Sequence, residues 1–284
     1  MPQNVPDVEY YADYLKSLEK RPEDLPLSAH YHTWTPESVM RVWKVWTNNR
    51  YLRTQFYPSA YFEAFLAQAR PHLGSVGVVA DIGCGTGTML SILARAGIGA
   101  QFIGIDLSDE SLAKLRTAFS GDARLAFKVG SISQIPLDDQ SCDLVICTET
   151  LEHLFPGDFT QGLAEIARVL KPGGHLLATV PLEERPAFVV CPECYAIFTP
   201  FQHMLFNFTI AGLTRELGRH GVEIVHVIHP IDAGVPRRAW QRFVKDKILL
   251  RYLPGLARRL FRVNGVTGFV ARKAPVTTSV AATA

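Results

Sequence analysis

Val78-Val79-Ala80-Asp81-Ile82-Gly83-Cys84-Gly85-Thr86-Gly87 is the most informative segment of this chain. A β-branched, apolar run leads into three glycines at alternate positions, and a helical pattern begins at Met89. Glycine adopts positive φ without strain and leaves room for a ligand where a Cβ would collide. The free N–H groups at the start of the following helix favour an anionic or polar ligand. The segment therefore predicts a buried strand, a ligand-binding turn and a helix.

Apolar runs and helical patterns alternate on both sides of this turn. The predicted strands are 76–82, 101–106, 125–130, 142–148, 175–181, 222–229 and 268–272. The predicted helices between them are 89–96, 108–119, 158–170 and 209–220. Such strands connect through right-handed crossovers into a mostly parallel sheet. We predict an α/β, Rossmann-like sheet of seven mostly parallel strands with helices on both faces.

The regions outside this pattern differ in composition. Residues 1–75 are rich in aromatic side chains and predict a helical cap or lid, in which His30 and His32 are further active-site candidates. Residues 76–275 form the predicted main domain, with a helical insertion at about 236–263 before the last strand. Residues 276–284 are small and aperiodic, which predicts a disordered tail.

Composition and charge exclude several classes of protein. Apolar residues make up 48% of the 284 residues, as in an ordinary globular protein. The formal net charge is only +2, so the chain as a whole has no strong positive electrostatic potential that would attract nucleic acid. An odd number of cysteines, five, argues against a disulfide framework. No apolar run reaches the roughly 18 residues that a membrane span needs, and no signal peptide is evident. We expect a soluble, cytoplasmic protein that acts on a small molecule.

One segment departs from this balance. Arg237–Arg262 contains nine Lys or Arg residues and one acid, interleaved with apolar residues. It predicts a basic amphipathic surface that contacts an anionic membrane or a phosphate-bearing substrate. The alternative is a helical insertion with a solvated basic face.

The glycine turn excludes one common cofactor class. In a dinucleotide fingerprint, G-x-G-x-x-G, the third glycine would fall on Thr88 or Leu90, so the pattern fails. The spacing G-x-G-x-G after Asp81 instead resembles the first motif of class I S-adenosylmethionine-dependent methyltransferases of types 11 and 12. Nineteen residues past Gly87, Asp106 ends the second strand, where a carboxylate can accept both ribose hydroxyl hydrogens. The alternative is a turn kept for packing.

The resemblance implies S-adenosyl-L-methionine as the cofactor. Asp81 and the glycine turn would hold its amino acid part, Asp106 its ribose, and the loop after the third strand its adenine. Many relatives carry an acid in that loop, whereas this chain has Ser131 and Ile132. The predicted cofactor-binding residues are Asp81, Gly83, Cys84, Gly85, Gly87, Asp106, Leu107, Ser131, Ile132 and Thr148.

Acidic and histidine side chains follow the fourth predicted strand. Glu149, Glu152 and His153 are spaced i, i+3 and i+4, so a helical turn beginning there would place them on one face. This E-x-x-E-H resembles the metal-dependent branch that includes small-RNA 3′-end 2′-O-methyltransferases and ubiquinone-pathway O-methyltransferases. The resemblance implies a divalent cation such as Mg²⁺, Mn²⁺ or Zn²⁺, with His203 as a fourth ligand. The alternatives are a metal-free base at His153 and a structural role.

A second metal candidate lies in Cys191-Pro192-Glu193-Cys194. A C-x-x-C pair in a reducing compartment often binds zinc, and His203 is a nearby further ligand. The two schemes compete for His203, so both cannot be complete. The alternative is a loop with two thiols.

These patterns together predict an enzyme. The leading hypothesis is a methyltransferase that acts on a hydroxyl oxygen of a small molecule, with Glu149, Glu152 and His153 as the catalytic residues. The alternatives are an RNA 2′-O-methyltransferase, a metal-independent N- or C-methyltransferase, an NAD-dependent oxidoreductase and a non-catalytic binding module.

Overall fold

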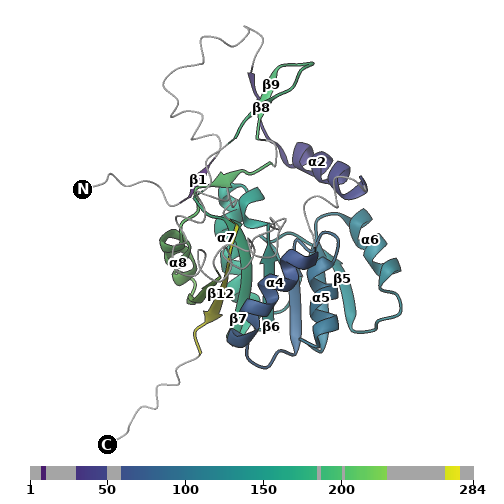
Figure 1. Ribbon diagram of the computed structural model, residues 1–284, viewed down its shortest axis with the longest axis vertical. Coiled ribbons are helices and arrows are strands. Elements are labelled where there is room, and N and C mark those ends of the chain that lie inside the picture. Colours follow the sequence, from purple (N-terminus) through teal and green to yellow (C-terminus); the bar gives the residue numbers. More distant parts are fainter. Residues whose placement is uncertain are drawn as a thin grey trace, which may run out of the picture.

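The computed structural model describes residues 8–10, 30–49, 59–183, 187–199, 202–228 and 266–275. The predicted basic insertion and the predicted tail lie outside them. The main strands are β3 (Val78–Ile82), β4 (Gln101–Asp106), β5 (Leu125–Val129), β6 (Cys142–Thr148), β7 (Leu170–Pro181), β11 (Val222–Ile228) and β12 (Val266–Lys273). They form one seven-stranded sheet in the order β11-β12-β7-β6-β3-β4-β5 (Figure 1). Only β12 runs antiparallel to its neighbours, which confirms the predicted fold class.

Helices cover both faces of this sheet. They are α4 (Ser59–Ala69), α5 (Thr88–Ala96), α6 (Asp109–Ala118), α7 (Pro156–Val169) and α8 (Ile210–Gly218). One buried cluster joins α4, α5 and α6 to the sheet through Phe65, Leu90 and Leu112. A second cluster on the opposite face contains Leu163 of α7 and Leu213 of α8. Burial of both faces explains why the central strands are continuously apolar.

The local signals in the sequence explain where elements begin and end. Ser108 caps α6, because its side chain accepts a hydrogen bond from the N–H of Ser111. Gly97, at φ +66°, ends α5 in the left-handed conformation. The predicted bounds of β4 and β6 agree with the structure, whereas β7 begins five residues before the predicted strand, at Leu170.

The described residues of the N-terminal region are mostly helical, with two short strands that the sequence did not predict. It contains α2 (Pro36–Asn48) and α4, a short 3₁₀ helix η1 (Arg70–His72), and two strands, β1 (Glu9–Tyr10) and β2 (His30–Tyr31). The strands pair with segments that follow β7: β1 with β10 (Leu205–Phe206), and β2 with β9 (Ala196–Phe198), which also pairs with β8 (Val189–Val190). Figure 1 shows α2 and the β8–β9 hairpin together at the top of the sheet. Residues before the seven-stranded sheet and residues that follow β7 thus pair with each other above it.

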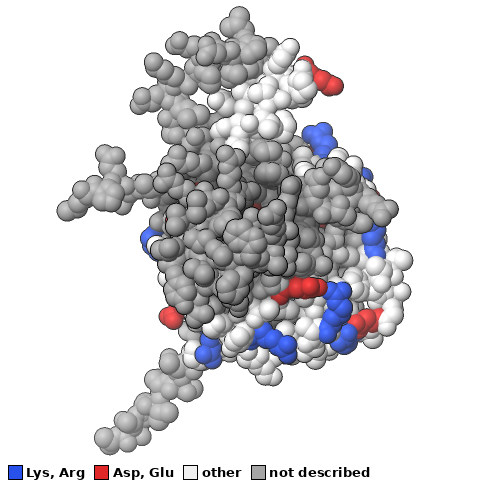
Figure 2. Space-filling model, viewed as in Figure 1, with Lys and Arg blue, Asp and Glu red and all other residues white. Residues whose placement is uncertain are grey.

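The described surface is mixed in charge. On the face in Figure 2, basic and acidic side chains are interspersed along the lower edge. In the part of the chain that the structure covers, no helix combines the length and apolarity needed to cross a bilayer.

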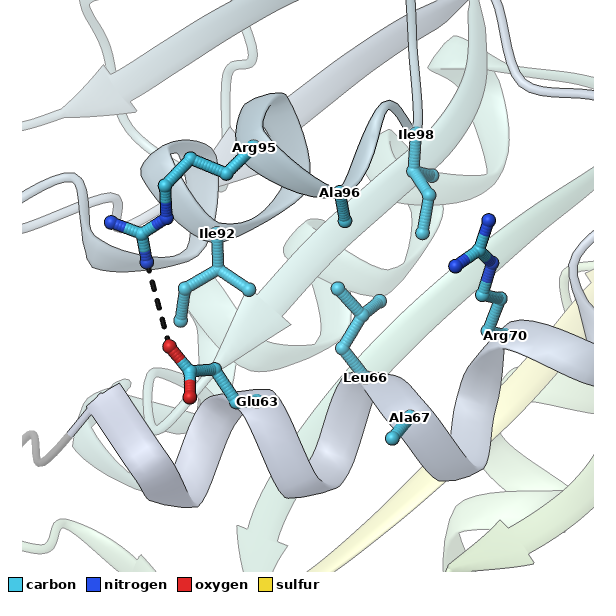
Figure 3. Close-up of a pocket in the computed structure, with 8 residues that line it drawn as sticks. All are labelled: Glu63, Leu66, Ala67, Arg70, Ile92, Arg95, Ala96 and Ile98. Carbon is cyan, nitrogen blue, oxygen red and sulfur yellow. Dashed lines mark ion pairs between the residues drawn. The ribbon is translucent and has the colours of Figure 1, made fainter.

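A groove between α4 and α5 lies away from the glycine turn (Figure 3). Glu63 and Arg95 form an ion pair across it, 3.5 Å from Oε1 to Nη2, and Leu66 and Ile92 line it. Arg95 lies at the C-terminal end of α5, whereas the glycine turn precedes the N-terminal end of that helix. A nine-residue helix is about 13 Å long, so this groove is a feature of helix packing at the opposite end of α5.

Candidate active site

The glycine turn between β3 and α5 has the conformation that its sequence requires. Gly83, Gly85 and Gly87 have φ values of +73°, +50° and +71°, a region that other residues adopt only with strain. A Cβ on Gly83 would lie 2.6 Å from the Thr150 hydroxyl oxygen. The N–H groups of Gly83 and Cys84 donate to the carbonyl of Ile105, at 2.8 and 3.0 Å. The turn is therefore fixed against the end of β4 before any ligand binds.

Two carboxylates face this turn. Asp106, at the end of β4, accepts hydrogen bonds from Gly85 N–H at 3.0 Å and Ser108 N–H at 2.9 Å. Asp81 is 2% exposed, and burial together with the nearby Asp106 raises its pKa to about 7. The paired acids make the pocket favourable for a ligand that carries a positive charge and hydroxyl groups.

The loop after β5 closes the same pocket. Gly130 N–H donates to the carbonyl of Asp106 at 3.1 Å, which brings the predicted adenine loop beside the predicted ribose contact. The Ser131 hydroxyl bonds the Ser133 hydroxyl at 2.8 Å. Ile132 is buried, whereas the side chain of Leu107 is 55% exposed next to Asp106.

Cys84 and Thr148, two of the predicted cofactor residues, differ in the atoms that they make available to a ligand. The Cys84 side chain is buried, and burial raises the pKa of its thiol, so only its backbone faces the turn. Thr148 ends β6, and its carbonyl accepts a hydrogen bond from the Thr150 hydroxyl at 3.0 Å. All ten predicted cofactor residues lie on the ends of β3, β4 and β6 and on the turns and loops that follow β3, β4 and β5.

Glu149 does not lie where the helical spacing predicts. The short 3₁₀ helix η2 (Leu151–His153) begins only after it, and Glu149 itself has φ +49°. Its N–H donates to Thr179 Oγ1 at 3.1 Å, and that hydroxyl donates to Glu149 Oε1 at 2.8 Å. Glu149 thus contacts β7 and precedes the helical turn, so Glu149, Glu152 and His153 do not share one face of a helix.

Three of the predicted metal ligands do come together. Single ligand atoms of Glu152, His153 and His203 all lie within 4.8 Å of one another. His153 Nε2 is 3.9 Å from Glu152 Oε1, and the two histidine rings are 5.1 Å apart between centroids. The Met204 N–H donates to the Glu152 carbonyl at 2.7 Å, which brings the His203 loop onto η2.

The hydrogen bonds of His153 determine its tautomer. Nδ1 lies 3.1 Å from the carbonyl oxygen of Gln202, which only accepts, so Nδ1 carries the hydrogen. Burial, with the charge of His203 as a second cause, lowers the pKa of His153 to about 3. The ring is therefore neutral at pH 7, and its Nε2 lone pair points toward the Glu152 carboxylate.

The cap supplies two residues that sequence reasoning did not select. Trp43 of α2 packs on His153, with ring centroids 4.7 Å apart and planes at 79°. The hydroxyl of Tyr61, on α4, faces Glu149, Glu152 and Thr179. Periodicity marks Tyr61 as a core residue, and no sequence signal places its hydroxyl at the site.

The Tyr61 hydroxyl is in an unusual position. The side chain is 7% exposed, and its oxygen has no hydrogen-bond partner of ordinary geometry among the residues the structure covers. The Thr179 hydroxyl lies beside it and donates its own hydrogen to Glu149, so toward Tyr61 it can act only as an acceptor. Burial and the charge of Glu149 raise the pKa of Tyr61, so the hydroxyl keeps its hydrogen.

The second predicted metal set is not assembled. Cys191 and Cys194 lie on the turn between β8 and β9. Within the described ranges, His203 clusters with Glu152 and His153 and not with these cysteines. Residues 202–206 pack onto η2, which places His203 in the first set.

Comparisons with known proteins agree with this geometry. Residues 80–178 match the family described as "Methyltransferase domain". The ubiquinone biosynthesis O-methyltransferase of Burkholderia lata is 32% identical over 163 residues, which are 53% of this chain and 68% of that protein. A fatty-acid O-methyltransferase of Mycolicibacterium smegmatis is 36% identical over 115 residues, 40% of this chain and 39% of that protein. For three curated relatives, that enzyme among them, the chain spans only 29%, 39% and 37% of their length.

A solved structure supports the fold. The 1,6-didemethyltoxoflavin-N1-methyltransferase of Burkholderia thailandensis, with bound 1,6-didemethyltoxoflavin and S-adenosylhomocysteine, superposes with a TM-score of 0.58 at 19% identity. The match covers 87% of this chain and 93% of that one.

Proposed function

Because this chain belongs to the class I S-adenosylmethionine-dependent methyltransferases, we propose that it transfers the cofactor's methyl group to a hydroxyl oxygen of a small molecule. One observation carries the preference for oxygen. Glu152, His153 and His203 bring a carboxylate and two imidazoles within 4.8 Å of one another beside the end of β6. Such a set of side chains binds and activates a hydroxyl group better than it binds an amine or a carbon nucleophile.

The cofactor takes the pocket built by the glycine turn. The ionised Asp81 carboxylate and the amides of the turn bind its amino acid part, and Asp106 accepts the ribose hydroxyls. The glycines at positive φ keep side chains out of that space. When bound, the cofactor would supply the electrophilic methyl group, and Asp106 and the loop after β5 are the residues that would hold its adenosine.

The residues present fit a divalent cation. A buried carboxylate and the Nε2 lone pair of a neutral imidazole face each other at 3.9 Å, an arrangement that a positive charge between them stabilises. With Glu149 outside the cluster, two imidazoles and one carboxylate favour a transition-metal ion over Mg²⁺. When bound, such an ion supplies a Lewis acid that lowers the pKa of the acceptor hydroxyl.

The side chains of the site then have separate roles. The Nδ1–H bond to Gln202 holds the His153 ring so that Nε2 points inward. A positive charge on this enclosed ring is costly, which favours a ligand role over a general base. Trp43 covers His153 and excludes water, while the acceptor oxygen is aligned with the methyl–sulfur bond.

The experiment uses the cofactor labelled with ¹³C in its methyl group. The purified chain is incubated with a panel of phenols, hydroxy acids, amines and activated carbon acids, and nuclear magnetic resonance locates the label. We expect an O-methyl product whose formation stops with EDTA and returns with Zn²⁺ or Mn²⁺.

Two results would decide against the proposal. Label found only on nitrogen or carbon, at a rate that EDTA does not change, would remove both the oxygen preference and the metal. Label found only on RNA added to the panel would support the RNA alternative instead.

A further inference from the structure

Residues 130–137, here called the adenine loop because they follow β5 and include the predicted adenine contacts, form a closed turn. The Gln134 N–H donates to the Ser131 carbonyl at 3.1 Å, and the two residues also form an isolated β-bridge. A Cβ on Gly130 would lie 2.5 Å from Cδ of Pro136, so the first arm of the loop (130–132) touches the second arm (135–137). The position of the whole loop therefore depends on the elements that hold its two arms.

Helix α7 holds the second arm through two charged side chains. Glu165 Oε2 accepts a hydrogen bond from the Ile135 N–H at 2.8 Å. The Arg168 guanidinium donates to the carbonyls of Ile135 and Leu137 at 2.9 and 2.8 Å. Glu165 and Arg168 also form a bidentate pair, at 2.7 and 2.8 Å, which fixes the orientation of the guanidinium. The pair therefore satisfies three main-chain groups of a loop segment that has no regular secondary structure of its own.

The same helix supports the first arm at a glycine. A Cβ on Gly162 would lie 2.9 Å from Cγ1 of Ile132, so the loop packs closely against the backbone of α7 there. Ile132 is buried in a cluster that also contains Leu163 of α7. Gly162, Glu165 and Arg168 follow one another at intervals of three residues, so one side of the helix supports both arms of the loop.

The beginning of the loop is tied to the proposed ribose contact, because the Gly130 N–H donates to the Asp106 carbonyl at 3.1 Å. Residues 130–137 include no carboxylate, so adenine would be bound there by main-chain groups and uncharged side chains. The strength of such contacts depends on the shape of the loop. A loop that is already held in its bound shape loses less conformational freedom when the ligand binds.

We propose that Glu165 and Arg168 are positioning residues, which hold the adenine loop in its cofactor-binding shape before the cofactor binds. The inference rests on the cofactor site proposed above. The two side chains bond the main chain of the loop, so they act on the cofactor through the loop. Without them the adenine contacts would still be present, but binding would have to order them.

Calorimetry with two ligands tests this role: S-adenosylhomocysteine, and 5′-methylthioadenosine, which lacks the amino acid part. We expect Arg168→Ala to raise both dissociation constants by about tenfold, because binding must then order the loop. Arg168→Lys keeps the charge and part of the hydrogen bonding, so it should recover part of the affinity. Asp81→Asn, by contrast, should weaken the binding of S-adenosylhomocysteine far more than that of 5′-methylthioadenosine.

Two control variants separate positioning from general stability. Lys171→Ala removes an ion pair with Asp143 at 2.9 Å, at the opposite ends of β3 and β6, and should lower stability without changing either dissociation constant. In α7, Gly162→Ala pushes Ile132 and should weaken both ligands by about threefold or more. Gly157→Ala adds the same methyl group where no atom lies within 4 Å and should change neither dissociation constant.

Hydrogen exchange followed by mass spectrometry shows directly whether the loop is what changes. In ligand-free Arg168→Ala, exchange should be faster in residues 130–137 and unchanged in the central strands, and S-adenosylhomocysteine should restore the protection. The proposal is overturned if Arg168→Ala or Gly162→Ala binds both ligands with wild-type affinity, or if exchange in Arg168→Ala accelerates across the whole sheet. If the wild-type chain binds neither ligand, the proposed cofactor site itself fails, and this inference fails with it.

Discussion

Asp81 is the residue whose ionisation state a bound ligand would change most. It is almost completely buried, and the neighbouring Asp106 is a second reason for its raised pKa. Asp106 is better stabilised as a carboxylate, because the N–H groups of Gly85 and Ser108 donate to it. A bound ammonium group would convert Asp81 to the ionised form, so cofactor binding and deprotonation are coupled.

This coupling predicts a pH dependence of cofactor affinity. Below its pKa of about 7, Asp81 is protonated and cannot pair with the cofactor's ammonium group. Affinity for S-adenosylhomocysteine, measured by calorimetry, should therefore rise between about pH 6 and pH 8, with release of a proton. Asp81→Asn should bind more weakly, and its profile should be flat over this range. An equal rise in Asp81→Asn would assign the titration to another group.

The Tyr61 hydroxyl yields a prediction that separates function from stability. Because this buried hydroxyl makes no hydrogen bond of ordinary geometry in the described chain and has only the Thr179 hydroxyl close by, its removal in Tyr61→Phe should leave the melting temperature unchanged or slightly raised. If the hydroxyl donates to the bound acceptor, kcat/KM should fall by about 3- to 10-fold. Tyr195→Phe, on the hairpin turn, is the matched control and should change neither quantity. A lower melting temperature with unchanged kcat/KM would instead indicate a structural role.

Single residues also mark the limit of sequence reasoning. The identities of Asp81, the turn glycines and Asp106 follow from local pattern, because each sits at a strand end whose position the pattern predicts. The orientation of Glu149 does not follow from local pattern, because its positive φ depends on Thr179, thirty residues later in the chain. The partnership of His203 with Glu152 likewise depends on tertiary contacts, through Gln202 and Met204.

At the scale of elements, the sheet was the most predictable part. The strands 101–106 and 142–148 contain the continuous apolar runs 102–105 and 144–147, and a polar residue stands on each side of each run, so the strand ends are sharp. The short strands β1, β2, β8 and β10 carry two residues each. Two residues contain no periodicity, so only the paired partner makes them strands.

The packing of α4 on β12 yields a stability prediction. A Cβ at Gly268 would collide with the buried Phe65 ring, with Cδ2 at 2.7 Å and Cζ at 2.9 Å. Gly268→Ala should therefore lower the free energy of unfolding by about 1–3 kcal/mol, because the core must shift. Gly157→Ala, in the first turn of α7 with no atom within 4 Å of the added Cβ, is the control and should be neutral or slightly stabilising. Urea unfolding followed by circular dichroism measures both, and equal stabilities would contradict the packing described.

At the scale of the whole molecule, the proposed cofactor site and the proposed reaction side come from different elements. The ends of β3, β4 and β5 form the proposed cofactor site, whereas η2, the residues around His203, α2 and α4 form the proposed reaction side. The cap joins residues before the sheet to residues after β7 through two strand pairings. Of the segments on the proposed reaction side, α2, α4 and the residues around His203 lie outside the 80–178 family match, whereas η2 lies within it.

This separation supplies the most direct test of the proposed chemistry. Glu152→Gln removes the buried carboxylate between the two histidines and leaves the cofactor pocket intact. The account predicts an unchanged dissociation constant for S-adenosylhomocysteine and a single-turnover methyl-transfer rate at least about 100-fold lower than that of the wild-type chain. A variant that binds the cofactor product and still transfers the methyl group at the wild-type rate would contradict it.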